Sequence, residues 1–168
     1  MEEETKPKNK KITPYIVIII VVIVILLGGV TYAGLMIKNR LQNAVGGFKV
    51  DTTNNTYNVK TGNLNTVVGQ DNIPWPAELP IDVPKYQGGK IKAVTHDSGQ
   101  NIWVISVSDT SRAEFNNYKT YLINTGWKEN EQTNVPVDIV QMKKAENQIT
   151  VTFEPTSKTL LISLSPVK

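Results

Sequence analysis

The sequence contains one apolar segment that is too long for a β-strand. Ten consecutive Ile and Val residues run from Ile16 to Ile25, inside an uncharged stretch from Ile12 to Ile37. As a helix rising about 1.5 Å per residue, this stretch would be about 39 Å long, enough to cross a hydrocarbon core of about 30 Å with some tilt. The segment therefore predicts a single transmembrane helix over residues 12–37.

A cleaved signal peptide is the alternative interpretation of the same run. Lys10 and Lys11 would form its charged flank, and Thr31 and Ala33 would be the small residues at a cleavage site. Against this, the apolar part exceeds the usual length of about 7–15 residues and continues to basic residues that are typical of a stop-transfer signal. The transmembrane anchor is the favoured prediction.

The orientation of the anchor follows from basic residues near its two ends. Four precede it and three follow it: Lys6, Lys8, Lys10 and Lys11, then Lys38, Arg40 and Lys49. The more basic end stays inside, and long domains translocate largely regardless of charge. We therefore expect a single-pass protein of the cell membrane, with residues 1–11 as a cytoplasmic tail, the lipid bilayer as the anchor's partner and the C-terminal part outside.

The charge of the remaining chain excludes one large class of partners. Six of the 18 basic and three of the 15 acidic residues precede residue 41, which leaves 12 of each sign. A nucleic-acid partner requires a concentrated basic face, and none is indicated. The chain contains no Cys, which rules out disulfides, Cys-ligated metals and thiol chemistry.

An Asn- and Thr-rich stretch follows the anchor. Residues 41–72 include seven Asn and five Thr, with short alternating pieces separated by turn-prone pairs such as Asn54-Asn55 and Gly62-Asn63. We expect residues 38–71 to form a polar stalk. Whether the stalk is a marginal β-meander or a poorly ordered spacer is left open.

Four prolines then divide an apolar segment, Pro74, Pro76, Pro80 and Pro84. Prolines at this density prevent a helix and keep the chain extended, so the apolar side chains between them need a surface to cover. They either pack across the following domain or stay exposed for binding. The candidate binding face consists of Trp75, Tyr86 and Trp103.

Residues 72–168 have the pattern of a folded domain. Lys90–Thr95 would place Ile91, Ala93 and Thr95 on one face, and Ile102–Ser108 would place Trp103, Ile105 and Val107 on one face. The turn-prone residues between these strands predict a β-hairpin.

A helix should follow, beginning at a capping box. Ser111 is the N-cap and Glu114 the reciprocal residue, ahead of a stripe that contains Phe115, Tyr118 and Leu122. Gly126 should end the helix in a left-handed conformation, so that the side chain of the next residue, Trp127, folds back onto the last turn.

Three further strands are predicted, over Val137–Met142, Ile149–Phe153 and Leu160–Leu164, because apolar and polar residues alternate in each. The order ββαβββ with short links indicates the α+β class. We expect a small antiparallel sheet with a single helix packed on one face.

The chain contains the sequence LPIDVPKYQGGKIKAV, a capped helix that ends in TGW and the final three strands. In these features it resembles a family of small bacterial envelope proteins with a membrane or lipid anchor. The shared turn is Tyr-x-Gly-x-Lys, formed here by Tyr86, Gly88 and Lys90, and the resemblance covers about Tyr57 to Val167. It implies location and fold. It implies no activity and no site residue.

The sequence contains no arrangement of residues typical of a nucleophilic triad or a zinc site. His96 is the only histidine and is expected to be a solvated residue of the hairpin turn. The acids that could pair for acid–base chemistry are Asp97, Asp109, Glu114, Asp138 and Glu154, and they do not cluster in the sequence. No catalytic, cofactor-binding or metal-binding residue is predicted.

Two functional hypotheses remain. The first is a non-catalytic envelope module that binds a protein, a peptide or a wall component through an open sheet face or edge. The second is a carboxylate-dependent hydrolase acting on cell-wall or sugar polymers. The first is favoured because a pair of neighbouring carboxylates is not indicated.

Overall fold

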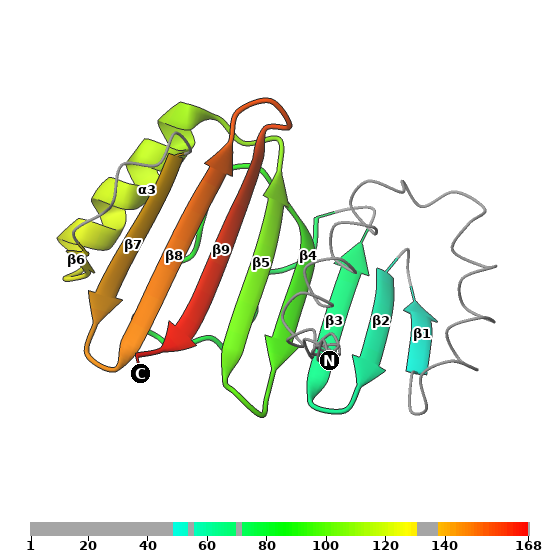
Figure 1. The fold of residues 1–168 in the computed structure, drawn as a ribbon. Coiled ribbons are helices and arrows are strands. Elements are labelled where there is room, and N and C mark those ends of the chain that lie inside the picture. Colours follow the sequence, from blue (N-terminus) through cyan, green and yellow to red (C-terminus); the bar gives the residue numbers. More distant parts are fainter. Residues whose placement is uncertain (1–48, 54–55, 70–71, 131–137, 168) are drawn as a thin grey trace, which may run out of the picture. The chain divides into compact units, whose positions relative to one another are not determined.

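The computed structural model describes residues 49–53, 56–69, 72–130 and 138–167. These residues form one antiparallel sheet of nine strands in the order β1-β2-β3-β4-β5-β9-β8-β7-β6, with one helix among them, α3 (Figure 1). The helix spans Arg112–Asn124. The strands are β1 (Lys49–Thr53), β2 (Thr56–Thr61), β3 (Leu64–Gly69), β4 (Lys90–Asp97), β5 (Ile102–Ser108), β6 (Lys128–Glu129), β7 (Asp138–Lys144), β8 (Asn147–Glu154) and β9 (Thr159–Pro166).

The predicted α+β class, with an antiparallel sheet and a helix, is confirmed. The predicted cytoplasmic tail and transmembrane helix, residues 1–11 and 12–37, lie outside the described residues. Within the part of the chain that is described, no helix is both long and apolar enough to cross a membrane.

The Asn- and Thr-rich residues contribute three strands to the sheet. β1, β2 and β3 form a meander, and β3 pairs with β4 from Leu64 opposite Asp97 to Val68 opposite Ala93. The sheet is therefore continuous across the division expected between residues 71 and 72. These residues alternate between polar and small apolar side chains. They form strands because β3 pairs with the edge of β4, which satisfies backbone N–H and C=O groups.

The predicted hairpin is formed by β4 and β5, but β4 contains a β-bulge. The register shifts between Ile91 and Ala93, so that Ile91 and Val94 face the core while Ala93 and Thr95 face the opposite side. The prediction that Ile91, Ala93 and Thr95 share a face was wrong. An extra residue in one strand reverses the alternation of all the residues beyond it.

The helix α3 has the predicted caps. The Glu114 amide donates to Ser111 Oγ at 3.3 Å and the Ser111 amide donates to Glu114 Oε2 at 2.7 Å, which completes the capping box. At the other end Gly126 has φ +93°, and the amides of Gly126 and Trp127 donate to the carbonyls of Ile123 and Leu122. These two bonds are the Schellman pattern, and Trp127 is only 1% exposed.

The hydrophobic core lies on one face of the sheet, over β4, β5, β9, β8 and β7. Two pieces of chain cover it: α3, and the proline-rich residues 72–89, which Figure 1 shows passing behind the central strands. Phe115 of α3 stacks on Phe153 of β8, with ring centroids 6.0 Å apart. The indole N–H of Trp127 donates to the carbonyl of Asp82, which ties the two covering pieces together.

His96 is not the solvated turn residue that the sequence predicted. It lies within β4, opposite Trp103 of β5, and its ring stacks on the indole with centroids 3.8 Å apart. Its Nε2 is shielded from solvent and has no hydrogen-bond partner among the described residues. The prediction failed because β4 continues to Asp97, beyond the end expected at Thr95, so that His96 still pairs with a residue of β5.

Candidate functional site

The three residues of the predicted binding face do not form an exposed surface. Tyr86 and Trp103 are 4% and 6% exposed, and Trp75 is half-buried against the core. Tyr86 packs edge to face on Tyr118 of α3, with ring centroids 5.1 Å apart. The structure thus shows the packing alternative, in which the proline-rich segment covers the sheet and turns its aromatic side chains inward.

The acids considered for acid–base chemistry each have a local structural partner. Those acids are Asp97, Asp109, Glu114, Asp138 and Glu154. Asp138 forms an ion pair with Arg112 at 2.7 Å, and Asp97 accepts hydrogen bonds from two amides of its own turn. No group of three or more potential metal ligands occurs among the described residues.

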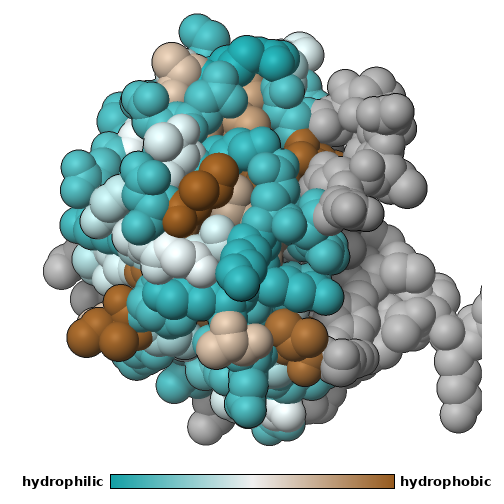
Figure 2. Space-filling view, turned by 90° about the vertical axis from the view of Figure 1, so that its left-hand side faces the viewer, coloured by the Kyte–Doolittle hydropathy of each residue, from teal (hydrophilic) through white to brown (hydrophobic). Residues whose placement is uncertain are grey.

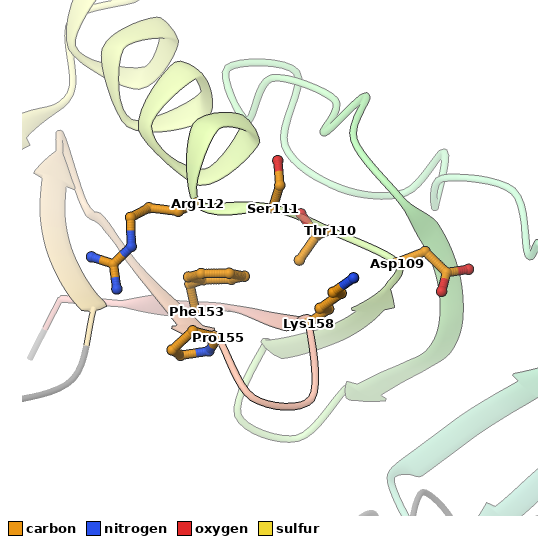
Figure 3. A pocket seen from close by; sticks show the side chains of 7 residues that line it. All are labelled: Asp109, Thr110, Ser111, Arg112, Phe153, Pro155 and Lys158. Carbon is orange, nitrogen blue, oxygen red and sulfur yellow. The ribbon is translucent and has the colours of Figure 1, made fainter.

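A depression of about 460 Å³ lies at the start of α3 (Figure 3). Figure 3 shows the Phe153 ring in its centre, with Arg112 and Lys158 on either side. Its lining residues are Asp109, Thr110, Ser111, Arg112, Phe153, Pro155 and Lys158. Although a helix N-terminus favours anions, the capping box already occupies the Ser111 and Glu114 amides, and Asp138 neutralises Arg112.

A second depression, of about 440 Å³, lies between α3 and residues 85–88. We call it the α3 groove. Its lining residues are Lys85, Tyr86, Gln87, Gly88, Glu114, Asn117, Tyr118 and Tyr121. The four helical residues have the spacing i, i+3, i+4, i+7, so they form one stripe along α3 that faces the extended chain.

The buried tyrosines of the α3 groove are fixed in position by their hydroxyl groups. The Tyr86 hydroxyl is hydrogen-bonded to that of Thr110, which lines the first depression. The Tyr118 hydroxyl donates to the Pro84 carbonyl at 2.9 Å. Burial raises the pKa of Tyr118 well above its ordinary value, and Tyr86 adds to this effect. The pKa of Tyr86 is also raised, mainly by burial.

The outer part of the α3 groove carries polar groups that are not used by the fold. Among the described residues, the side chains of Lys85, Gln87, Asn117 and Tyr121 make no hydrogen bond or ion pair with one another or with other residues. Tyr121 is 52% exposed. These groups can therefore contact a ligand without breaking an internal interaction.

The surface around α3 is hydrophilic. Figure 2 shows the side on which α3 and β6 lie in Figure 1, and hydrophobic residues form only small, separate patches on it. By contrast, residues at the centre of the other sheet face, such as Ala93, Thr95 and Ser106, are buried. The polar α3 groove is therefore the better candidate for a binding site than the sheet face that the sequence had suggested.

Comparison with known proteins found no match, whether with protein families, with curated proteins or with solved structures. The sequence did not single out Asn117 and Tyr121, although both lie on the stripe of α3 that begins at Glu114. That stripe borders the buried stripe of α3, which contains Phe115 and Leu122. The sequence did not indicate which segment of the chain packs beside it.

Proposed function

We propose that the protein is a membrane-tethered module whose sheet domain, from β1 to β9, lies outside the cytoplasm and binds an envelope component without catalysing a reaction. The apolar run over residues 12–37 and the slight basic excess before it support the tether and its orientation. The envelope partner is a protein, a peptide or a component of the wall.

One observation carries the non-catalytic part of this proposal. Among the described residues, neither depression beside α3 is lined by two carboxylates, since Asp109 is the only acid in the first and Glu114 the only acid in the α3 groove. Glycoside hydrolysis of the common kind needs two carboxyl groups separated by about 5–10 Å. A groove with one acid, two amides and an exposed phenol can hold a ligand by hydrogen bonds, but it lacks the second group for acid–base catalysis.

The membrane arrangement can be tested on native membranes. The protein should stay in the membrane after alkaline carbonate washing, and protease added to spheroplasts should remove the residues beyond about position 41. Release of a soluble chain beginning near Gly34 would establish signal-peptide cleavage. Protection of the C-terminal part from external protease would contradict the orientation.

The absence of catalysis can be tested with isolated wall sacculi and the full chain in detergent. We expect the protein to cosediment with the sacculi, or with an envelope protein cross-linked to them, without releasing soluble sugar. Release of reducing sugar that is lost in Glu114→Gln or Asp109→Asn would support the hydrolase instead and overturn the proposal.

A further inference from the structure

We infer that the α3 groove is a saccharide-binding site, which takes a short neutral glycan rich in hydroxyl groups. This inference rests on the proposed function, since it names the class of envelope component that is bound. It is carried by the unused polar side chains of the groove, by its single exposed aromatic ring and by its rigid walls.

The walls of the α3 groove are fixed before any ligand binds. The extended chain is held to the helix at Pro84, whose carbonyl accepts from Tyr118, and at Asp82, whose carbonyl accepts from the Trp127 indole at 3.1 Å. The Tyr86 hydroxyl is held by Thr110. Binding a ligand therefore requires little ordering of the protein, which lowers the entropic cost of association.

Gly88 lets the extended chain lie close to α3. A Cβ atom at this position would lie 2.7 Å from the Tyr86 hydroxyl oxygen and 3.0 Å from Glu114 Cβ. Any side chain here would press on the two walls at once. The absence of a side chain therefore lets the extended chain approach α3 closely.

The groups that face this space suit vicinal hydroxyls. Asn117 and Gln87 each offer an amide that both donates and accepts hydrogen bonds. Glu114 keeps one carboxylate oxygen, Oε1, because the capping box uses only Oε2. Tyr121, half-exposed at the rim, offers a ring face for the apolar side of a sugar. A groove of about 440 Å³ is in the size range of small-ligand sites.

The charges and the aromatic residues argue against other ligand classes. Lys85 on one wall is countered by Glu114 on the other, so the groove has no net charge to select a polyanion. A proline-rich peptide would need a row of exposed aromatic ridges. Here Tyr86 and Tyr118 are about 95% buried with their hydroxyls engaged, and a single exposed ring remains.

The test is an equilibrium titration of the full chain in detergent, using a fluorescently labelled β-1,4-linked N-acetylglucosamine hexamer as the probe. We expect a Kd of about 0.1–1 mM, as for a shallow preformed groove. Asn117→Ala and Tyr121→Ala should each weaken binding about tenfold. Two exposed residues of the same helix that face away from the groove supply matched controls: Asn116→Ala and Ile123→Ala should leave the Kd unchanged.

Two results would overturn the inference. One is no binding of the hexamer when its concentration is raised to about 10 mM, well above the expected Kd. The other is binding that is weakened equally by Asn117→Ala and Asn116→Ala. If a polyproline peptide binds and depends on Tyr121 while the hexamer does not bind, the ligand class is wrong. The protease experiment and the cosedimentation of the unaltered chain with sacculi would still decide the proposed function, because neither presupposes that the α3 groove is the binding site.

Discussion

The two ends of the sheet share one hydrogen-bonded ladder but differ in what covers them. The row of paired residues that contains Ile105, Ile162 and Val151 is apolar across β5, β9 and β8, and it reaches Asn58 on β2. The core cluster includes no residue of β2. At the β7 end, α3 and the proline-rich segment bury this face, so that Ile105, Ile162 and Val151 are at most 2% exposed.

Buried polar atoms without a hydrogen-bond partner occur at both ends, on β5 and β7 as well as on β2, β3 and β4. On the same face, beyond the core, Asn58 Oδ1, Asn65 Oδ1 and His96 Nε2 are shielded from solvent and lack hydrogen-bond partners among the described residues. A buried polar group without a partner costs about 1–3 kcal/mol. Since the core that can offset this cost lies at the covered end, the two ends differ in stability, although both are paired in the same sheet. We expect the covered end, which also carries the α3 groove, to supply most of the stability, with β1 and β2 depending on it.

The largest expected effect is at the strand that both ends share. Gly89 precedes β4 and has φ +67°, and an added Cβ would overlap the carbonyl oxygen of Ser108. Gly89→Val should therefore reduce the free energy of unfolding by more than about 4 kcal/mol, because neither backbone can yield without breaking the β4–β5 pairing. Denaturant unfolding of the full chain in detergent would measure this. A loss below about 1 kcal/mol would show that the backbone at Gly89 and Ser108 can shift to accept a side chain.

Two valines compare the core with the β2 end of the sheet. Val151 of β8 is 1% exposed within the core, whereas Val59 of β2 is half-buried on the opposite face, where it pairs with Thr66. Val151→Ala should cost about 2–3 kcal/mol, from lost burial and the cavity left behind, and Val59→Ala less than about 1 kcal/mol. Equal losses in the same unfolding experiment would mean that both ends are packed alike.

The covered end should also respond to alkaline pH through Tyr118. Burial, with a smaller contribution from Tyr86, raises the folded-state pKa of Tyr118 above the ordinary value of about 10. Stability is then fully present below about pH 10 and falls as the pH rises further, because the unfolded chain ionises first.

Tyr118→Phe should cost about 1 kcal/mol at neutral pH, through the lost hydrogen bond to Pro84, and should reduce the loss of stability above pH 10. Unfolding curves at a series of pH values for both proteins would measure the two effects. If Tyr118→Phe lost as much stability above pH 10 as the unaltered protein, the loss would come from groups other than Tyr118.

The smallest effects compare two glycines with positive φ and free space around them, Gly126 after α3 and Gly62 between β2 and β3. Alanine at either position is strained by about 1 kcal/mol. Gly126→Ala should show this loss in global unfolding. Gly62→Ala should show only a few tenths of a kcal/mol, because local opening of β2 would release the strain first. Equal losses would argue that the sheet unfolds as a single unit.

Local signals in the sequence predicted the covered end well. The capping box depends on two residues three positions apart, Ser111 and Glu114, and the helix end depends on Gly126 with its neighbour Trp127. Both motifs are complete within a few residues, so no tertiary information was needed. The strands that became β5, β7, β8 and β9 alternate clearly because one of their faces is buried by α3 and the proline-rich segment.

The β1–β3 end and the candidate site depend on tertiary structure instead. The Asn- and Thr-rich residues have little apolar contrast, so their pairing with β4 could not be separated from a disordered spacer. The bulge after Ile91 has no signature in the sequence. Because of it, Thr95 lies on the side of the sheet opposite to Ile91. The α3 groove exists because residues 82–88 run back along α3, and only that path places Gln87 across from Asn117.

Native-state hydrogen exchange of the backbone amides, measured on the full chain in detergent, tests the central comparison most directly. If the covered end carries the stability, amides of β5, β9 and β8 should exchange only through global unfolding. Amides in the β2–β3 ladder should then exchange through openings at least about 2 kcal/mol lower in free energy. Equal protection across the ladder, from β2 to β8, would contradict this account and would show that β1–β3 are as firmly held as the core.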